Sequence, residues 1–259
     1  MKIIKILVDI LENKKQKNQK LLFKITIIFL FAMLFSFIHF NSLQLQAEEE
    51  KYYPPALGPI IGHKGGVNGF TNPEGRKNGI AINNIPDVGA SLYIPLDFVY
   101  NIGMYVDLTF NTNTFLMRYN YSQNDYSNND RMQFSYISLS PVFNHAGFTI
   151  GFNFGIPVAA DWKGINIPTS KLNNIVEIRA GYSYPLYFDD VGRLNLFVNL
   201  SYSLNGVFTD FSKDDPLKNI VPAIPPQVIT NYYNPRPATI QIGVNFLFNL
   251  IELPDEYYE

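Results

Sequence analysis

Apolar side chains recur at every second position in several long stretches of this chain, and this period constrains the fold more than any other feature. In residues 102–110 the even positions are Ile, Met, Val, Leu and Phe, and the odd positions are Gly, Tyr, Asp and Thr. Successive side chains of a β-strand point to opposite faces, so such a stretch predicts a strand with one apolar and one mainly polar face. The same alternation appears in residues 148–156, 176–184, 194–204 and 240–248, whereas no stretch after residue 48 has the period of an amphipathic helix.

The length of these stretches favours a membrane barrel over a soluble β-sandwich, which also alternates. They run for about 9–12 residues, whereas strands of globular proteins usually have about five or six residues. A length of about 9–12 residues is close to what a tilted strand needs to cross a bilayer. The polar face consists largely of Gly, Ser, Thr and Asn, which suits a narrow interior, and the apolar face is continuous, which suits lipid. Weaker stretches at 57–70, 88–94 and 132–143 bring the predicted number of strands to eight.

The connections between these stretches alternate between long and short. Outer-membrane barrels have long external loops and short periplasmic turns, and a Greek-key sandwich has no reason to sort its loops in this way. Each short connection begins with a proline, which we expect just past a strand, where no N–H is needed for pairing. The long connections are roughly 71–86, 118–131, 158–172 and 206–237, and the short ones are Pro95–Asn101, Pro141–Gly147 and Pro185–Arg193.

Aromatic residues at the predicted strand ends indicate a girdle at each membrane surface, as barrels of this kind have. The residues concerned are Tyr93, Phe98, Tyr100, Tyr184, Tyr187 and Phe188 at one rim and Phe115, Tyr119 and Trp162 at the other.

The first 47 residues have the features of a secretory signal peptide. Residues 1–24 carry seven Lys against two acidic residues, and residues 25–40 form an uncharged, mostly apolar run of 16 residues. Such a pair of regions, closed by a small residue, predicts cleavage after Ala47; the alternative is an uncleaved anchor, although 16 residues are short for a span of about 20. The predicted organisation is a signal peptide at 1–47, a short periplasmic segment at 48–56, a barrel at 57–250 and an acidic tail at 251–259.

Composition excludes several functional classes. The chain has no Cys, which rules out disulfide scaffolds, thiolate metal sites, cysteine nucleophiles and a lipidated N-terminal Cys. Its formal charge is −2 and it has no basic region after residue 24, which argues against nucleic-acid binding. No spacing of His, Asp or Glu predicts a metal site, and no glycine-rich phosphate loop predicts a nucleotide or another cofactor.

The segment QIGVNFLF at the end of the last predicted strand resembles the terminal-strand signal by which assembly machinery recognises outer-membrane barrels. The matching residues are Gln241, Gly243, Phe246 and Phe248. Together with the eight strands and the signal peptide, this makes residues 57–250 similar to small outer-membrane β-barrel proteins: OmpX- and OmpW-like barrels and the PorT-like group. Barrels of that kind usually end at the aromatic residue, whereas this chain continues to Glu259. The resemblance implies that outer-membrane lipid and, during biogenesis, the assembly machinery are its partners.

Three charged residues fall on the predicted inward face: Asp107, Glu177 and Arg179. Glu177 and Arg179 are two apart on one strand, so we expect their side chains to be neighbours. The set predicts either a constriction in the lumen or, as we favour, a structural ion pair, because an eight-stranded barrel has room for side chains rather than an aqueous pore.

The longest predicted connection, 206–237, combines several prolines with an apolar content unusual for a loop. A loop of this length is functional or disordered, and its apolar residues predict that it caps the barrel mouth or binds a protein or polysaccharide partner.

The sequence therefore predicts an eight-stranded antiparallel transmembrane β-barrel in the outer membrane of a diderm bacterium, with a non-enzymatic structural or interaction role through its external loops. Three alternatives remain open: a narrow channel for a small apolar solute, a soluble periplasmic β-sandwich or lipocalin-like carrier, and a lipid-modifying barrel enzyme. The enzyme is disfavoured because His63 and His145, the histidines outside residues 1–47, have no matching serine or acidic motif.

Overall fold

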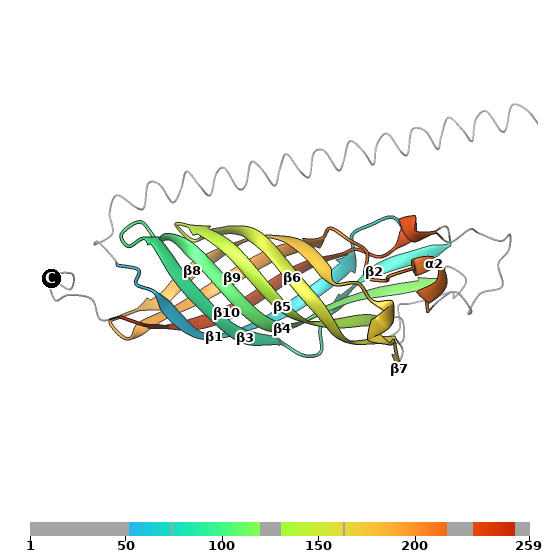
Figure 1. Ribbon diagram of the computed structural model, residues 1–259, viewed down its shortest axis with the longest axis horizontal. Helices are drawn as coiled ribbons and strands as arrows, with labels where there is room; N and C mark the ends of the chain where they lie inside the picture. The colour runs from blue at the N-terminus through green and yellow to red at the C-terminus, as the bar shows by residue number, and fades with distance from the viewer. Residues whose placement is uncertain (1–51, 74, 120–130, 163, 217–229, 252–259) are drawn as a thin grey trace, which may run out of the picture. The chain divides into compact units, whose positions relative to one another are not determined.

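The computed structural model describes residues 52–73, 75–119, 131–162, 164–216 and 230–251 (Figure 1). The predicted signal peptide and residues 252–259 of the predicted tail lie outside this range. Within it the chain forms one antiparallel sheet of ten strands with a few very short helices, so the all-β prediction is confirmed. None of these helices is long and apolar enough to span a membrane.

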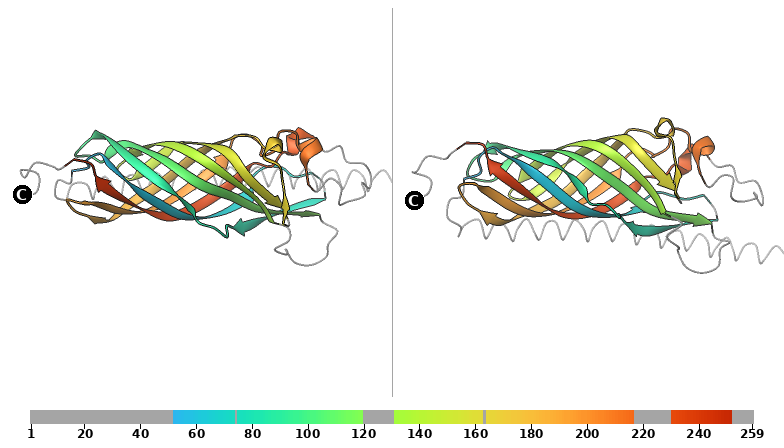
Figure 2. Two further views of the ribbon diagram at one scale, coloured as in Figure 1. Left: turned by 60° about the horizontal axis from the view of Figure 1, so that its bottom comes forward. Right: turned by 90° about the horizontal axis from the view of Figure 1, so that it is seen from below.

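The sheet closes on itself into a barrel. Each of eight long strands pairs antiparallel with the next, and the last pairs back with the first, from Ala56 opposite Asn249 to Asn68 opposite Pro237. The tilted strands can be followed around the barrel in Figure 2. The eight strands are β1 (Ala56–Asn68), β3 (Asp87–Asp97), β4 (Ile102–Tyr119), β5 (Arg131–His145), β6 (Phe148–Trp162), β8 (Ile175–Phe188), β9 (Gly192–Ser203) and β10 (Pro237–Asn249).

The two ends of the barrel differ in their connections. At one end, called the turn end here, the strands are joined through residues 98–101, 146–147 and 189–191. At the other, the loop end, lie the long connections and the small elements β2 (Arg76–Ile82), β7 (Ile165–Asn166), η2 (Thr169–Lys171), α2 (Phe211–Asp214) and η3 (Asn231–Tyr233). The predicted sorting of short and long connections is thus what the described residues show.

The prediction that residues 71–86 form one connection is wrong, because β2 lies within it. β2 pairs with β1 and β4, the same two strands that β3 pairs with. β2 and β3 therefore lie in one line, separated by a break at residues 83–86. Side chains replace the pairing that the break removes: Asn83 donates to the carbonyl of Thr112, and Asp87 accepts from the N–H of Thr112 at 2.9 Å. The sequence of the break, Asn-Asn-Ile-Pro, has the composition of a turn, which concealed the strand before it.

The prediction that three prolines lie just past the ends of strands is also wrong. Strands β3, β5 and β8 continue past Pro95, Pro141 and Pro185, so the turns are shorter than predicted. The pairing shifts register after Pro95 and after Pro185, which is where a strand tolerates a residue without an N–H.

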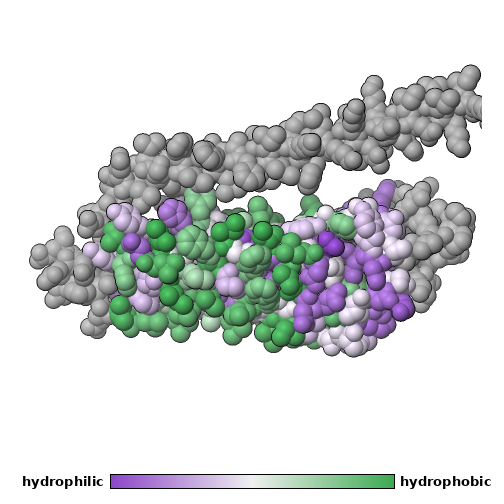
Figure 3. Space-filling model, turned by 45° about the horizontal axis from the view of Figure 1, so that its top comes forward, coloured by the Kyte–Doolittle hydropathy of each residue, from purple (hydrophilic) through white to green (hydrophobic). Residues whose placement is uncertain are grey.

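The outer wall is apolar and the lumen is largely polar, as the alternation predicted. On β9, Leu196, Val198 and Leu200 are exposed, whereas the alternate residues Asn195, Phe197 and Asn199 are buried. On the face of the barrel seen in Figure 3, apolar residues cover most of the wall and hydrophilic residues gather at the loop end. Residues 194–204, at about 3.3 Å per residue and a tilt of about 40°, give an apolar band roughly 25 Å high, the height of a membrane barrel's lipid-facing belt.

Three residues of the predicted aromatic girdles face the lumen instead. Tyr93, Phe115 and Trp162 are buried inside the barrel. The side chain of Tyr119 lies outside the described residues. Exposed aromatic rings do line the turn end, where Phe98, Tyr100, Tyr184 and Tyr187 are found.

Candidate functional site

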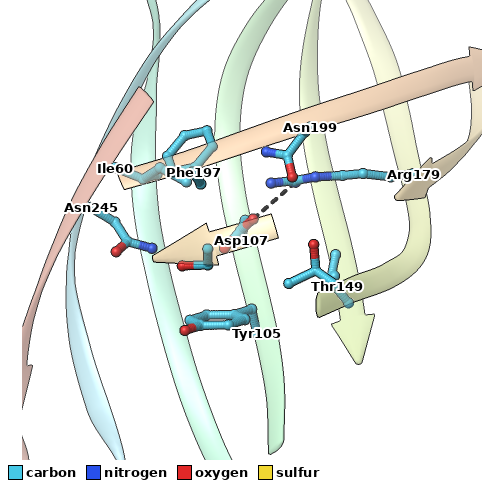
Figure 4. Close-up of a pocket in the computed structure, with 10 residues that line it drawn as sticks. Ile60, Tyr105, Asp107, Thr149, Arg179, Phe197, Asn199 and Asn245 are labelled. Carbon is cyan, nitrogen blue, oxygen red and sulfur yellow. Dashed lines mark hydrogen bonds and ion pairs between the residues drawn. The ribbon is translucent and has the colours of Figure 1, made fainter. Parts of the chain in front are cut away.

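A network of charged and amide side chains fills the middle of the lumen. Arg179 on β8 forms an ion pair with Asp107 on β4, with Nη1 and Oδ2 2.9 Å apart (Figure 4). The other carboxylate oxygen of Asp107 accepts from the hydroxyl of Ser91 at 2.6 Å. Because the pair joins strands on different sides of the barrel, it braces the wall across the lumen. The members of this lumen network are Lys64, Asp87, Ser91, Asp107, Asn113, Ser140, Asn153, Glu177, Arg179, Asn199 and Gln241.

Glu177 is held by hydrogen bonds from amides rather than by an ion pair with Arg179, its neighbour on the strand face. Its carboxylate is 1% exposed and accepts from the amides of Asn113 at 2.7 Å and Asn153 at 2.6 Å. Arg179, two residues away, pairs with Asp107 instead. The sequence therefore identified three residues that lie on the inward face, but not which of them pair.

A second buried ion pair, Lys64 with Asp87, was missed. The Lys64 Nζ is 2.9 Å from Asp87 Oδ2, and the same Nζ donates to Asn113 at 3.3 Å. Asp87 also accepts from the amide of Gln241 at 2.7 Å. Lys64 lies on a strand whose pattern is weakened by glycines, and Asp87 comes directly before a predicted strand. The inward position of Lys64, two residues from Gly62 and two from Gly66, was nevertheless available as a signal.

The network leaves little free space. Two cavities of about 20 Å³ each lie in the lumen, and Arg179 lines both of them. Figure 4 shows the first, with Asp107, Tyr105 and Asn199 around it. A cavity of this size holds about one water molecule, so these spaces suit hydration of the network rather than passage of a solute.

Aromatic rings and one arginine fill the lumen at the turn end. The guanidinium of Arg193, which is 1% exposed, lies 4.2 Å from the ring centroid of Tyr93 and 5.5 Å from that of Tyr53. Tyr93 packs in turn on Tyr105, with ring centroids 5.0 Å apart. The segment before β1 is held over this stack because the N–H of Tyr53 donates to the carbonyl of Phe98 at 2.8 Å.

At the loop end the lumen contains an apolar core, which we call the outer core. Three of its residues, Val207, Phe208 and Phe211, come from the connection between β9 and β10 and are fully buried. Phe208 packs edge-to-face on Phe134 with ring centroids 5.6 Å apart, and Phe134 stacks on Phe115 at 5.7 Å. The described part of loop 206–237 therefore caps the barrel mouth, one of the two roles predicted for it. The outer core consists of Phe115, Met117, Met132, Phe134, Tyr136, Ala160, Trp162, Ile167, Leu172, Ile175, Val207, Phe208 and Phe211.

Polar contacts anchor this cap. A buried ion pair joins Arg76 on β2 to Asp215 after α2. The amide of Asn234 donates to the carbonyl of Phe208 at 2.6 Å and accepts from its N–H at 3.0 Å, and Asn173 donates to the same carbonyl at 2.8 Å. The cap is thus fixed to β2 through Arg76 and to the segment before β8 through Asn173, and Asn234 joins the two described parts of the cap to each other.

The four residues that resemble an assembly signal also have contacts in the folded wall. The side-chain amide of Gln241 donates a hydrogen bond to Asp87. Gly243 has no space for a side chain, because a Cβ there would come within 2.5 Å of the Phe197 ring and 2.3 Å of the Ile61 carbonyl oxygen. Phe246 and Phe248 lie on the lipid-facing side, with ring centroids 4.7 Å apart. Folded-state packing therefore accounts for Gln241 and Gly243 without the signal, and the signal itself stays a prediction.

The histidines do not come together. His63 is exposed on the outer wall opposite Ile242, and His145 is exposed at the turn end opposite Phe148. Among the described residues no group of three or more His, Cys, Asp or Glu side chains is arranged to hold a metal ion.

No family model and no curated protein matches this chain. Among solved structures it is similar to Ail, the attachment invasion locus protein of Yersinia pestis, in complex with the heparin analogue sucrose octasulfate (11% identity, TM-score 0.33, 76% of this chain and 100% of that one). It is also similar to the outer membrane protein OprG from Pseudomonas aeruginosa (10%, TM-score 0.32, 78% and 97%) and to the translocator domain of the autotransporter NalP from Neisseria meningitidis (9%, TM-score 0.29, 83% and 95%).

These TM-scores are below 0.5, so the description of the fold rests on the molecule itself. A closed antiparallel ring, a continuous apolar outer wall and a polar lumen define a small β-barrel of the outer-membrane type.

Proposed function

We propose that this chain is an integral outer-membrane protein with a non-enzymatic structural or interaction role, carried by its loop end. The observation that supports this most is the filling of the lumen, with the turn-end aromatic stack, the lumen network and the outer core following one another along the barrel. A barrel filled in this way has its accessible chemistry on the loops. In this proposal the turn end faces the periplasm and the loop end faces the exterior, after export by the signal peptide at 1–47.

The narrow-channel alternative finds no support in this packing, because the cavities have room for about one water each. In planar bilayers we expect the purified protein to show no steady conductance. A conductance that disappears in Arg179→Ala would favour the channel instead. The enzyme alternative would need acid–base groups within about 3 Å of a reacting atom, and the separation of His63 and His145 does not supply such a pair.

Membrane fractionation followed by gel electrophoresis of boiled and unboiled samples tests the location. We expect the protein in the outer-membrane fraction, with a mobility that shifts on boiling because the closed ring resists detergent. A soluble protein with no shift would contradict the proposal and favour the periplasmic carrier.

Single cysteines test the orientation without background, since the chain has none of its own. Lys213 is exposed on α2 at the loop end and Asp190 is exposed in a turn at the turn end. We expect a membrane-impermeant maleimide to label Lys213→Cys on intact cells and Asp190→Cys only after the outer membrane is permeabilised. The reverse pattern would overturn the assignment of the loop end to the exterior.

A further inference from the structure

An exposed tyrosine stands at the loop end on a support of other rings. Tyr232 is 63% exposed, and its ring packs edge-to-face with Phe70 and with Tyr233, both at 5.4 Å between centroids. The guanidinium carbon of Arg236 lies 4.6 Å from the centroid of Phe70. We call Phe70, Tyr232, Tyr233 and Arg236 the aromatic platform.

One buried asparagine fixes the two segments that form the platform. Asn68, at the end of β1, is 2% exposed, and its side-chain oxygen accepts from the N–H of Phe70 at 3.3 Å and from the N–H of Arg236 at 3.0 Å. Its amide nitrogen donates to Asn72 at 2.7 Å. The backbone adds a bond from the N–H of Gly69 to the carbonyl of Arg236 at 2.9 Å. The platform is therefore held in place before any partner arrives, which lowers the entropy lost on binding.

The aromatic platform is also anchored to the outer core. Tyr233 is partly buried and packs against the outer core, and Asn234, the next residue, is bonded to Phe208 inside it. The exposed ring of Tyr232 is thus connected through Tyr233 to the buried outer core. An isolated exposed tyrosine on a loose loop would have no such support.

The chemistry around Tyr232 favours a carbohydrate over a protein partner. Thr230, Asn231 and Asn72 next to the platform are polar and at least partly exposed, so the apolar surface is limited to the rings, whereas a stable protein interface covers roughly 800 Å² on each partner. The guanidinium of Arg236 makes no ion pair with a carboxylate of the described residues and is a planar donor of several hydrogen bonds. A ring face beside amide and guanidinium donors matches a pyranose, which has an apolar C–H face and polar edges.

We propose that the aromatic platform binds a carbohydrate chain, with one pyranose ring on Tyr232 and with Arg236 donating to the hydroxyl or carboxylate groups of that ring or its neighbour. This inference rests on the proposed function, because it requires the loop end to face the exterior. It names the class of ligand and the residues that would contact it.

Binding of purified full-length protein in detergent to three oligosaccharides tests the proposal: maltohexaose, chitohexaose and hexagalacturonate, each by titration calorimetry. We expect at least one of them to bind, Tyr232→Ala to weaken that binding at least ten-fold, and Tyr232→Phe to retain it. Tyr187→Ala is the matched control, since Tyr187 is 54% exposed but lies at the turn end, and it should leave binding unchanged. A preference for hexagalacturonate that Arg236→Gln removes would assign a carboxylate to Arg236, and equal binding of a neutral chain would assign hydroxyl groups.

Absence of binding to all three oligosaccharides, or equal binding by wild type and Tyr232→Ala, would overturn the proposal. Each variant is first checked for the mobility shift on boiling, so that a failure to fold is not taken for a loss of binding. A barrel that fractionates with the outer membrane and binds none of the three would remove the platform proposal alone. A barrel that does not reach the outer membrane would remove the proposed function as well.

Discussion

At the scale of single residues, the lumen is stabilised by charges whose partners are all inside the barrel. The ion pair between Arg179 and Asp107 is nearly buried, and removing one member leaves the other charge without compensation. We expect Arg179→Gln to lower the free energy of unfolding by about 3–5 kcal/mol in guanidinium titrations of the protein in lipid vesicles. The double variant Asp107→Asn with Arg179→Gln should cost less than the sum of the single variants, because it removes both charges. Strictly additive losses would show that the two groups do not stabilise each other.

The turn between β8 and β9 carries a carboxylate that titrates in an exposed position. Asp189 accepts from the Tyr187 hydroxyl at 2.6 Å and from the N–H groups of Gly192 at 2.9 Å and Val191 at 3.0 Å. Chiefly the Tyr187 hydrogen bond, and then the one from Gly192, lower the pKa of this carboxyl below its ordinary value. Because the folded-state pKa is the lower one, the stabilisation is complete above the ordinary Asp pKa of about 3.9 and is lost as the pH falls through the folded value.

We therefore expect Asp189→Asn to be less stable than wild type at pH 7 and no less stable at pH 2, measured as the temperature at which the unboiled band disappears. Asp190→Asn, one residue away, is the control and should follow wild type at both pH values. A difference for Asp189→Asn that persists at pH 2 would mean that the turn, rather than the ionised carboxylate, is responsible.

At the scale of elements, the outer core contains a natural reporter. Trp162 at the end of β6 is the one tryptophan of the chain and is 3% exposed inside the barrel. We expect its fluorescence to be insensitive both to acrylamide and to brominated lipids, whereas a girdle tryptophan would be quenched by the lipids. Phe208→Ala opens the core beside it and should increase quenching by acrylamide without abolishing the mobility shift on boiling. Strong quenching of the wild type by brominated lipid would place Trp162 on the outer wall and contradict the structure.

The alternation of side chains was sufficient to predict most of the strands, because a wall between lipid and a polar lumen requires that alternation at every step. It failed where another interaction replaced the usual pairing or the usual faces. β2 was concealed by the break at 83–86, where Asn83 and Asp87 bond to the backbone of β4. Phe115 and Trp162 were assigned to a membrane girdle because nothing in their local sequence shows that the lumen becomes apolar at the loop end.

The contacts within the candidate sites were less predictable than the strands, because they join segments that are far apart in the sequence. The inward position of Asp107, Glu177 and Arg179 follows from the period of two, but the partner of each depends on the register between strands far apart in the sequence. The aromatic platform joins Phe70 to Tyr232 and Arg236 through Asn68, and no pattern within either segment indicates the other.

At the scale of the whole molecule, the barrel consists of three filled sections above one another: an aromatic stack, a polar network and an apolar core. The strands continue beyond the apolar band of the wall because they also surround the outer core at the loop end. There the outer surface of the strands seen in Figure 3 is mostly hydrophilic. The loop end is thus a small globular unit built on top of a membrane barrel. Its loops are positioned by that unit rather than by the membrane.

The closure of the ring makes the last strand necessary for all the others. β10 contributes Gln241 to the lumen network and pairs with both β1 and β9. We expect a chain that ends at residue 236 to give no mobility shift on boiling, even though seven long strands remain. A shifted band from that truncated chain would mean that the barrel closes in another register.

The pairing of β1 with β10 also sets an order of events during biogenesis. Every shorter intermediate has two open strand edges, which are ready templates for pairing with other chains. An intermediate without β10 also lacks Gln241, whose amide donates to Asp87 in the closed ring. Both ion pairs of the lumen network join strands that precede β10, so closure of the sheet adds Gln241 to the network and removes the two open edges. The strand edges of a partly paired chain are therefore removed only when β1 pairs with β10.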